Sequence, residues 1–366
     1  MSDSPAPTKN ASGAHRTGGP HWRARVRRLI GHPWIFQIVI IAALVAVAAY
    51  EIDLQALANA FKDARYEFLV AILAVTVVAR VLHAIEWQVE LTKVGKAPLF
   101  GLMGVLMIGT LVNMVVPASA GDVAKVQIAA NRYDLPRAGL IGTRGAEAVI
   151  NALIMVGFIA LAFALPGGAF GSKELLWTVL AASIVLFIGA FVASRTLPEH
   201  LPDWGMLRRV PFGLGAQLRF HWPRLYAGFE SVRRPGLLGL LVVMNIIGWG
   251  FDVLIVWLYG RAFHLSVPFD AYISVTVAIA IVTVFPITFG NIGTYELLVT
   301  SVLRLYGANA TDALAFAIAT HLFSTAYNIA LGLIAVWAMR LRPADVFRLA
   351  GGPERGHPRE RLADLS

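Results

Sequence analysis

The segment VVPASAGDVAK, residues 115–125, interrupts an apolar stretch with a proline, a serine, a glycine and an aspartate. The segment VFPITFGNIGTYE, residues 284–296, repeats this skeleton, and both contain the pattern P-x-[ST]-x-G-[DN]-[VI]. The matching positions are Pro117 and Pro286, Ser119 and Thr288, Gly121 and Gly290, Asp122 and Asn291, and Val123 and Ile292. Proline ends a helix, and glycine permits a tight backbone turn. Each copy therefore predicts a break between two short helices.

The composition around these breaks is that of an integral membrane protein. Hydrophobic residues make up 57% of the 366 residues and charged residues only 14%, with a mean hydropathy of +0.67; soluble domains carry about 25% charged residues. Six runs approach the roughly 20 apolar residues that cross a bilayer. These predicted spans lie near residues 35–50, 67–89, 141–164, 175–194, 236–260 and 313–339. The sequence thus predicts an all-α polytopic protein of a bacterial plasma membrane.

The loop charges predict which segments face the cytoplasm. Residues 1–33 carry six Lys and Arg against one acidic residue, residues 195–235 seven against three, and residues 340–366 six against four. Because positively charged loops stay inside, these segments and both termini are expected in the cytoplasm. The predicted organisation is a disordered tail at 1–33, one transmembrane domain at 34–340 with a basic linker at 195–235, and a disordered tail at 341–366. Ala46-Val47-Ala48 also fits a signal-peptide cleavage site, but we expect the first span to be retained.

One apolar run does not fit this topology as a full span. Residues 99–116 are apolar, but residues 121–137 carry several charged and amide side chains, which cannot face lipid. If the first run crossed alone, the basic linker would lie outside, against its charge. A re-entrant hairpin resolves the conflict, with a helix near 99–114 entering from the cytoplasm and one near 122–134 returning.

The second break predicts a matching hairpin that enters from the outer face. Its helices are expected near 269–284 and 294–306. The order helix, hairpin, helix then occurs at 67–164 and again, inverted, at 236–339. Transporters with inverted repeats bind substrate near the bilayer midplane, where broken helices meet.

The polar residues of each break are placed to cap the helix that follows it. Ser119 with Asp122, and Thr288 with Asn291, are the expected caps. The N-terminus of such a helix has free N–H groups and attracts anions, phosphate included. The alternative is that each break is a kink that its own caps satisfy and that binds nothing.

Two longer stretches carry a family resemblance. They are VVPASAGDVAKVQIAANRYDLPRAGLIGTRGAEAVI and FPITFGNIGTYELLVTSVLRLYGANATDALAFAIATHL. Over about residues 30–340 the chain resembles the flippase-like membrane region of the lysylphosphatidylglycerol synthases, including stand-alone members. It departs where the family's usual Gly-Gly is Phe289-Gly290, and where a Glu-Arg pair appears as Arg144 and Glu147. The resemblance implies movement of lipids or lipid-linked molecules between leaflets. It does not imply lipid synthesis, because the sequence has no counterpart of the aminoacyl-transferase domain.

Ionisable side chains inside the predicted spans are candidates for function because they are costly to insert into a membrane. Arg80, His83 and Glu86 share one helix face, and Arg144 and Glu147 can pair at i, i+3. The candidate substrate-binding and translocation residues are Arg80, Pro117, Ser119, Gly121, Asp122, Lys125, Arg144, Glu147, Pro286, Thr288, Gly290, Asn291 and Glu296. Arginine suits a phosphodiester because its planar fork donates two hydrogen bonds.

Other polar residues in the second half admit a structural interpretation. Asn245 and Asp252 share a helix face, and His321, Ser324 and Asn328 form a milder stripe on the last span. Interhelical hydrogen bonds that hold the bundle together would account for them. We favour that interpretation for His321 and Asn328.

The function expected from these features is lipid translocation. The substrate would be an anionic phospholipid or lipid-linked precursor, and envelope-biosynthesis enzymes are candidate partners. The alternatives are an ion-coupled small-solute transporter and a non-transporting accessory subunit of envelope lipid or glycan synthesis. The sequence contains no cysteine, P-loop, Rossmann or G-x-S-x-G motif, and its basic clusters lack interleaved aromatics. It therefore predicts no enzyme activity, cofactor, metal site or nucleic-acid binding.

Overall fold

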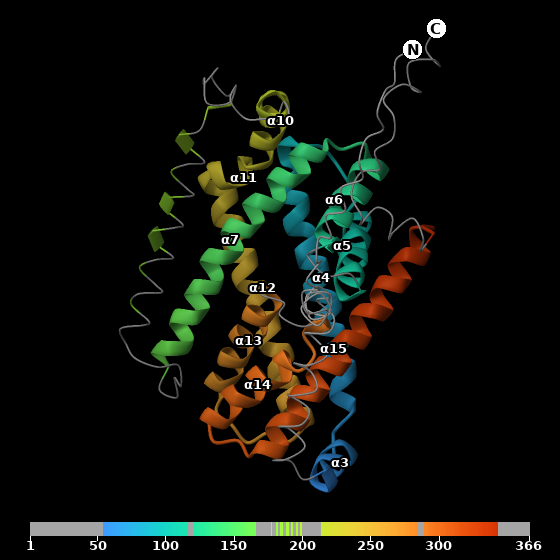
Figure 1. Cartoon of the computed structure of the whole chain (residues 1–366), viewed down its shortest axis with the longest axis vertical. Helices are drawn as coiled ribbons and strands as arrows, with labels where there is room; N and C mark the ends of the chain where they lie inside the picture. The colour runs from blue at the N-terminus through green and yellow to red at the C-terminus, as the bar shows by residue number, and fades with distance from the viewer. Residues whose placement is uncertain are drawn as a thin grey trace, which may run out of the picture.

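Helices form every regular element in the part of the chain that the computed structural model describes (Figure 1). The described residues are 54–115, 120–165, 214–284 and 289–342, with scattered positions between 177 and 199. Outside them lie the predicted span near 35–50, most of the span near 175–194, the tail at 1–33, nearly all of the tail at 341–366, and Pro117, Ser119, Pro286 and Thr288. The predicted all-α class is confirmed for the described residues.

Four of the described helices are long and apolar enough to cross a membrane. They are α4 (Glu67–Glu90), α7 (Arg137–Ala164), α12 (Pro235–Ala262) and α15 (Ala310–Ala338), and α4 continues into the 3-10 turn η1 (Leu91–Lys93). Helices of 24 to 29 residues are about 36–44 Å long, against about 30 Å of hydrocarbon. They match four of the six predicted spans, and the number of spans in the whole chain stays a prediction.

Four shorter helices form two pairs. They are α5 (Leu99–Val115) with α6 (Ala120–Tyr133), and α13 (Phe269–Val284) with α14 (Thr294–Leu305). These bounds agree with the sequence prediction to within two residues. In the sequence, each pair is indicated by two apolar or amphipathic runs with a polar break between them that contains proline and glycine.

The helices α5 and α6 pack antiparallel. Gly101 lies against the ring of Tyr133, and the backbone N–H of Gly121 donates to Oδ1 of Asn113 at 2.6 Å. The earlier residue of α5 thus contacts the later residue of α6, as it does in an antiparallel pair.

The helices α13 and α14 also pack together, on either side of the turn η3 (Phe289–Asn291). The hydroxyls of Ser274 and Tyr306 lie 2.7 Å apart. Gly290 and Asn291 both have φ of 60°, in the left-handed region that most residues avoid. The described part of the second break therefore has a left-handed turn before α14, a conformation that glycine and asparagine tolerate best.

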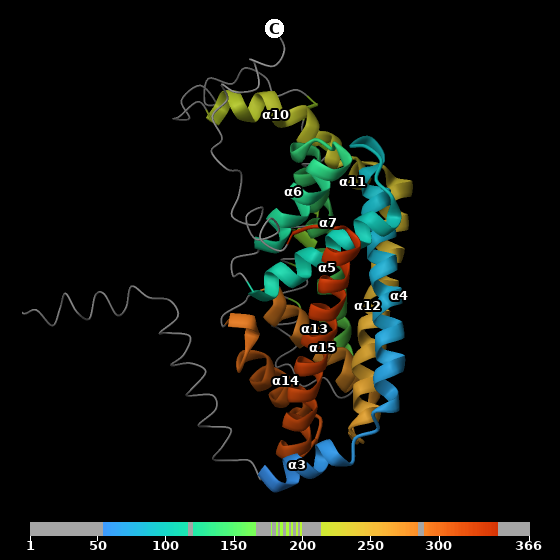
Figure 2. The same ribbon diagram turned by 90° about the vertical axis from the view of Figure 1, so that its right-hand side faces the viewer.

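The order long, short, short, long occurs twice, in α4 to α7 and in α12 to α15. The helices α4 and α12 run antiparallel, because Asn245 binds Glu86 while Gly248 lies against His83. In Figures 1 and 2, α5 and α6 lie in the upper half and α13 and α14 in the lower half. The two short pairs thus lie toward opposite ends of the long helices.

Two main hydrophobic cores correspond to these halves. The first gathers the end of α4, the pair α5 and α6, the start of α7 and the last turns of α15, and includes Trp87, Ile108 and Ala335. The second gathers α12, α13, α14 and the first half of α15, and includes Tyr259 and Phe316. The helix α15 therefore contributes to both.

Three further helices are described at the periphery: α3 (Leu54–Lys62), α10 (Leu214–Gly228) and α11 (Glu230–Arg233). The helix α10 lies across the upper end of the bundle (Figure 2). It packs closely on α7, since a Cβ on Gly142 would lie 2.2 Å from the carbonyl oxygen of Leu225.

Candidate functional site

The start of α6 is held by a side chain from α5. Oδ1 of Asn113 accepts a hydrogen bond from the N–H of Gly121, one of the donors that a helix N-terminus leaves unpaired. A Cβ on Gly121 would lie 2.0 Å from the carbonyl oxygen of Gly109. Glycine is needed here for the close approach of two helices, whereas Gly290 is needed for its backbone angle. The sequence analysis did not identify Asn113, an isolated amide near the end of an apolar run.

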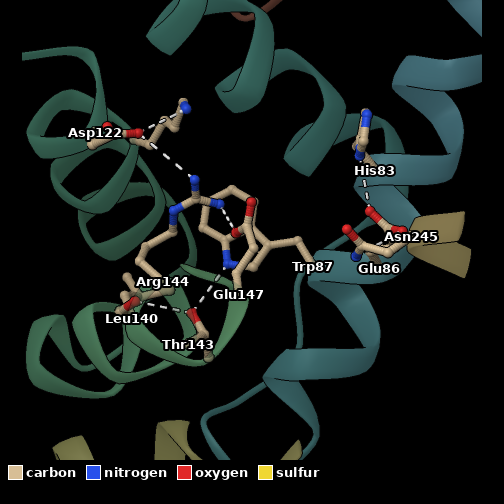
Figure 3. A network of polar contacts seen from close by, with 10 residues as sticks. His83, Glu86, Trp87, Asp122, Leu140, Thr143, Arg144, Glu147 and Asn245 are labelled. Atoms are coloured by element: carbon tan, nitrogen blue, oxygen red, sulfur yellow. Dashed lines mark hydrogen bonds and ion pairs between the residues drawn. The ribbon is translucent and has the colours of Figure 1, made fainter. Parts of the chain in front are cut away.

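Arg144, from α7, lies at the centre of a four-residue ionic network (Figure 3). Its guanidinium lies 3.7 Å from Oδ1 of Asp122 and forms a closer ion pair with Glu147. Nζ of Lys125 donates to the same Asp122 oxygen at 2.9 Å. The expected i, i+3 pairing of Arg144 with Glu147 is present. Two cations and two carboxylates give the network a formal charge of zero.

The network is partly open on the side of Asp122. The side chain of Asp122 is 45% exposed, whereas that of Lys125 is 11% exposed. Arg144 and Glu147 lie between these values. Asp122 is thus the member most accessible from outside the helix bundle. The expected capping role of Asp122 stays a prediction, since Ser119 lies outside the described residues.

Trp87 connects this network to α4. Its buried indole N–H donates to Oγ1 of Thr143 at 3.2 Å, and Thr143 in turn donates to the carbonyl of Leu140. The Arg144 guanidinium carbon lies 5.9 Å from the centre of the Trp87 ring, within the range of a cation–π contact. The ring therefore restricts where the guanidinium can move.

Glu86 organises a second polar group on α4 (Figure 3). His83 contacts it through Nδ1 at 2.8 Å, and Nδ2 of Asn245 donates to its other oxygen at 3.3 Å. One turn further, Glu90 is 3% exposed and its Oε2 has no hydrogen-bond partner among the described residues. The sequence analysis missed Glu90, although its spacing of four from Glu86 places both on one helix face.

Arg80 contacts the last long helix rather than the ionic network. Its guanidinium donates to Oδ1 of Asn328 on α15 at 3.2 Å. No described hydrogen bond or ion pair joins it to Asp122 or Arg144. Arg80 therefore links α4 to α15 and lies beside the network rather than within it. Asp252, from α12, lies within electrostatic range of Arg80.

The second break is held by Glu296 and His321. Oε2 of Glu296 accepts from the N–H of Gly293 at 2.6 Å, and Oε1 lies 2.6 Å from Nδ1 of His321. Nε2 of His321 lies 3.0 Å from the carbonyl oxygen of Gly290. The prediction that Asn291 caps α14 is wrong. The N-cap is Gly293, and Oδ1 of Asn291 is buried with no hydrogen-bond partner among the described residues.

Comparison with known protein families identifies the family of this chain. The family model described as "Lysylphosphatidylglycerol synthase TM region" matches residues 34–332. The chain belongs to this family. No curated protein and no solved structure matches it. The match confirms the resemblance in the sequence and spans most of the long and short helices described above.

In this lysylphosphatidylglycerol synthase TM-region protein, the two breaks differ in chemistry. The first carries a balanced ionic network around Arg144, with two basic groups that can meet an anion. The second carries a histidine and a carboxylate and no arginine or lysine among its described contacts. The turn η3 contacts α5, so the second break lies against the first short pair.

Proposed function

We propose that the chain moves a lipid, or a lipid-linked precursor, with an anionic phosphate-bearing headgroup between the leaflets of a membrane. The observation that carries the proposal is the partly exposed ionic network that joins a break between two short helices to a long apolar helix. Membership of the lysylphosphatidylglycerol synthase TM-region family supports a lipid-related role in a membrane.

The proposal includes the placement of the two short pairs in the bilayer. If the four long helices span, α5 with α6 and α13 with α14 enter as re-entrant hairpins from opposite faces, with both termini cytoplasmic. Their location toward opposite ends of the long helices supports this. Non-helical backbone at such depth needs cover from protein or water, and the contacts of Asn113 and Glu296 supply part of that cover.

The charge balance of the network suits a transient anion. Burying an unpaired charge is costly, and opposite charges in contact reduce that cost. Arg144 and Lys125 are neutralised by Asp122 and Glu147 while no headgroup is present. An arriving phosphodiester would take the place of a carboxylate on the guanidinium of Arg144. A guanidinium donates two parallel hydrogen bonds to either kind of group. In this proposal the network binds the headgroup during its passage.

The test is movement of labelled lipids in proteoliposomes. Arg144→Ala should slow transfer roughly 10- to 100-fold, the equivalent of about 1.5–3 kcal/mol for a lost charged hydrogen bond. Asp122→Asn should also slow it. The matched control is Arg234→Ala, which removes the ion pair of Arg234, the residue after α11, with Glu230 and should leave the rate unchanged.

Two outcomes would count against the proposal. Wild-type rates no faster than those of protein-free vesicles, across a panel of phospholipids and polyprenyl phosphates, would overturn it. Normal function after changes to the network, combined with lost function after changes to the surface, would favour an accessory subunit instead.

A further inference from the structure

Both ring nitrogens of His321 face oxygen atoms. Nδ1 lies 2.6 Å from Oε1 of Glu296, and Nε2 lies 3.0 Å from the carbonyl oxygen of Gly290. The ring also stacks on Tyr295, with centroids 4.5 Å apart. The side chains of His321 and Glu296 are 15% and 19% exposed. The imidazole is therefore held on two edges and one face.

These contacts fix the number of protons at the site. A backbone carbonyl only accepts hydrogen bonds, so Nε2 must carry a proton to bind Gly290. A second proton must then lie between Nδ1 and Glu296. It resides either on the imidazolium, which donates to a carboxylate, or on the carboxylic acid, which donates to the neutral ring. In both descriptions the pair holds one proton more than a neutral imidazole and an ionised carboxylate would hold together. This additional proton can exchange with the surroundings.

We propose that His321 and Glu296 form a binding site for one exchangeable proton, and that this proton holds residues 290–293 in the observed conformation. When it leaves, one contact must fail. If Nε2 keeps its proton, the lone pair of Nδ1 faces the carboxylate of Glu296. If Nδ1 takes the proton, the lone pair of Nε2 faces the Gly290 carbonyl. Neither neutral tautomer satisfies both oxygens.

The backbone that these contacts hold has an unusual conformation. Gly290, Asn291 and Gly293 all have positive φ, of 60°, 60° and 84°. Glu296 also binds the N–H of Gly293 through its second oxygen. One histidine and one glutamate thus hold both ends of the turn. Release of either end by loss of the proton would leave the backbone angles of the turn free to change, because one of the contacts that hold it is then lost.

Few of the ionisable groups on the helices packed against α15 contact the pair. The helices packed on α15 carry Lys62 on α3, Asp252, Tyr259 and Arg261 on α12, and Tyr295, Glu296 and Arg304 on α14, while α5 carries none. Of these, Tyr295 and Glu296 contact the ring of His321. The hydroxyl of Tyr295 binds Thr320. From α4, Arg80 binds Asn328, about two turns along α15.

This inference goes beyond lipid transport, because it rests on the geometry of the second break alone. If the proposed transport holds as well, the proton would be a coupling ion for it. Carboxylates and histidines at membrane depth commonly form proton relays in pumps and transporters.

The direct test is solid-state NMR of the full chain in lipid vesicles with ¹⁵N-labelled histidine. The chain has nine histidines, and His321 is identified by the signals that His321→Gln removes. Contact with ¹³C-labelled glutamate identifies the same ring without a substitution. At low pH both nitrogens should be protonated or share a proton with Glu296, and one proton should leave in a single step as the pH rises.

Glu296→Gln should abolish this step. A glutamine can donate to Nδ1 and still accept from Gly293, so the neutral ring keeps both contacts at every pH. Amide exchange at Gly293, corrected for its intrinsic pH dependence, should increase with proton loss in the wild type and stay constant in Glu296→Gln. The control is Glu86→Gln, which changes the other histidine–glutamate pair and should leave the His321 signals unaltered.

Two results would overturn the proposal. One is a His321 ring that stays neutral with a single protonated nitrogen from pH 5 to pH 9 in the wild type. The other is an unchanged titration step in Glu296→Gln. Neither measurement needs lipid movement, so failure of the transport proposal would be seen separately. If transport occurs, an imposed pH gradient should alter its rate in the wild type and not in Glu296→Gln.

Discussion

The same residue serves different purposes at the two matching positions of the repeated pattern. Gly121 is helical and has Gly109 against it, so what it provides is the lack of a side chain. Gly290 has open space around it but a φ of 60°, so what it provides is conformational freedom. A sequence pattern records that glycine is required and does not record why.

The first prediction concerns Gly121. Gly121→Ala should force α5 and α6 apart and destabilise the protein by about 1–3 kcal/mol, the usual cost of overpacking. Thermal unfolding in detergent would measure it as a lower Tm. Gly157→Ala is the control, because a Cβ there meets nothing within 4 Å; it should be neutral or stabilising. Equal losses in the two variants would contradict the role given to close packing.

The sequence analysis missed two residues of the candidate site for different reasons. Asn113 stands alone in an apolar run, where a single polar residue gives no pattern, whereas Glu90 lies four positions after Glu86, a spacing that places both on one helix face. Arg144 and Glu147 were found because the spacing of an ion pair on one helix is local. The role of His321 depends on Glu296, 25 positions earlier in the chain, and that contact exists only after folding.

At the scale of elements, the ends of the short helices depend on other helices. Asn113, on α5, accepts a hydrogen bond from the backbone N–H of Gly121 at the start of α6. His321, on α15, contacts the carboxylate of Glu296, which in turn binds the N–H of Gly293 just before α14. The bounds of the short helices were predictable because apolar runs and proline or glycine breaks are local signals. The contact at the start of α6 was not, because Asn113 comes from another helix. The predicted Asn291 cap was wrong, because α14 begins after Gly293, two residues further along the chain.

The second prediction tests this support. Asn113→Ala should leave the N–H of Gly121 without its acceptor and cost about 1–3 kcal/mol of stability, the usual penalty for an unsatisfied buried group. The change would be measured as a lower midpoint of denaturation. Thr110→Ala on the same helix is the control, because Thr110 binds only the carbonyl of Leu106 in its own helix. A loss in Thr110→Ala as large as that in Asn113→Ala would argue against the cap.

At the scale of the whole molecule, the arrangement of the two halves makes a topological prediction. The last turns of α6 and α14 each carry an arginine, Arg132 and Arg304. Both are exposed, and the chain has no native cysteine. Arg132→Cys should react with a membrane-impermeant thiol reagent from the cytoplasmic side, and Arg304→Cys from the outer side. Labelling of both from one face would exclude hairpins that enter from opposite faces.

The long-range order of the molecule is the part that the sequence left open. Hydrophobicity and loop charge predicted the long helices and their directions, because both are sums over many residues. Individual contacts between helices, such as that of Arg80 with Asn328, 248 positions apart, depend on the rotation of each helix about its axis. Apolar helices with residues of similar size on all faces give little indication of that rotation.

The place of α15 in the first core has a consequence for biosynthesis. Ala335, Val336 and Met339 belong to the core that α4, α5 and α6 form, yet they are translated about 200 residues after those helices at roughly 5–20 residues per second. The first half therefore enters the membrane with its core open and waits many seconds for the residues that complete it. A premature stop before Ala335 would leave an unfinished half that quality-control proteases could recognise.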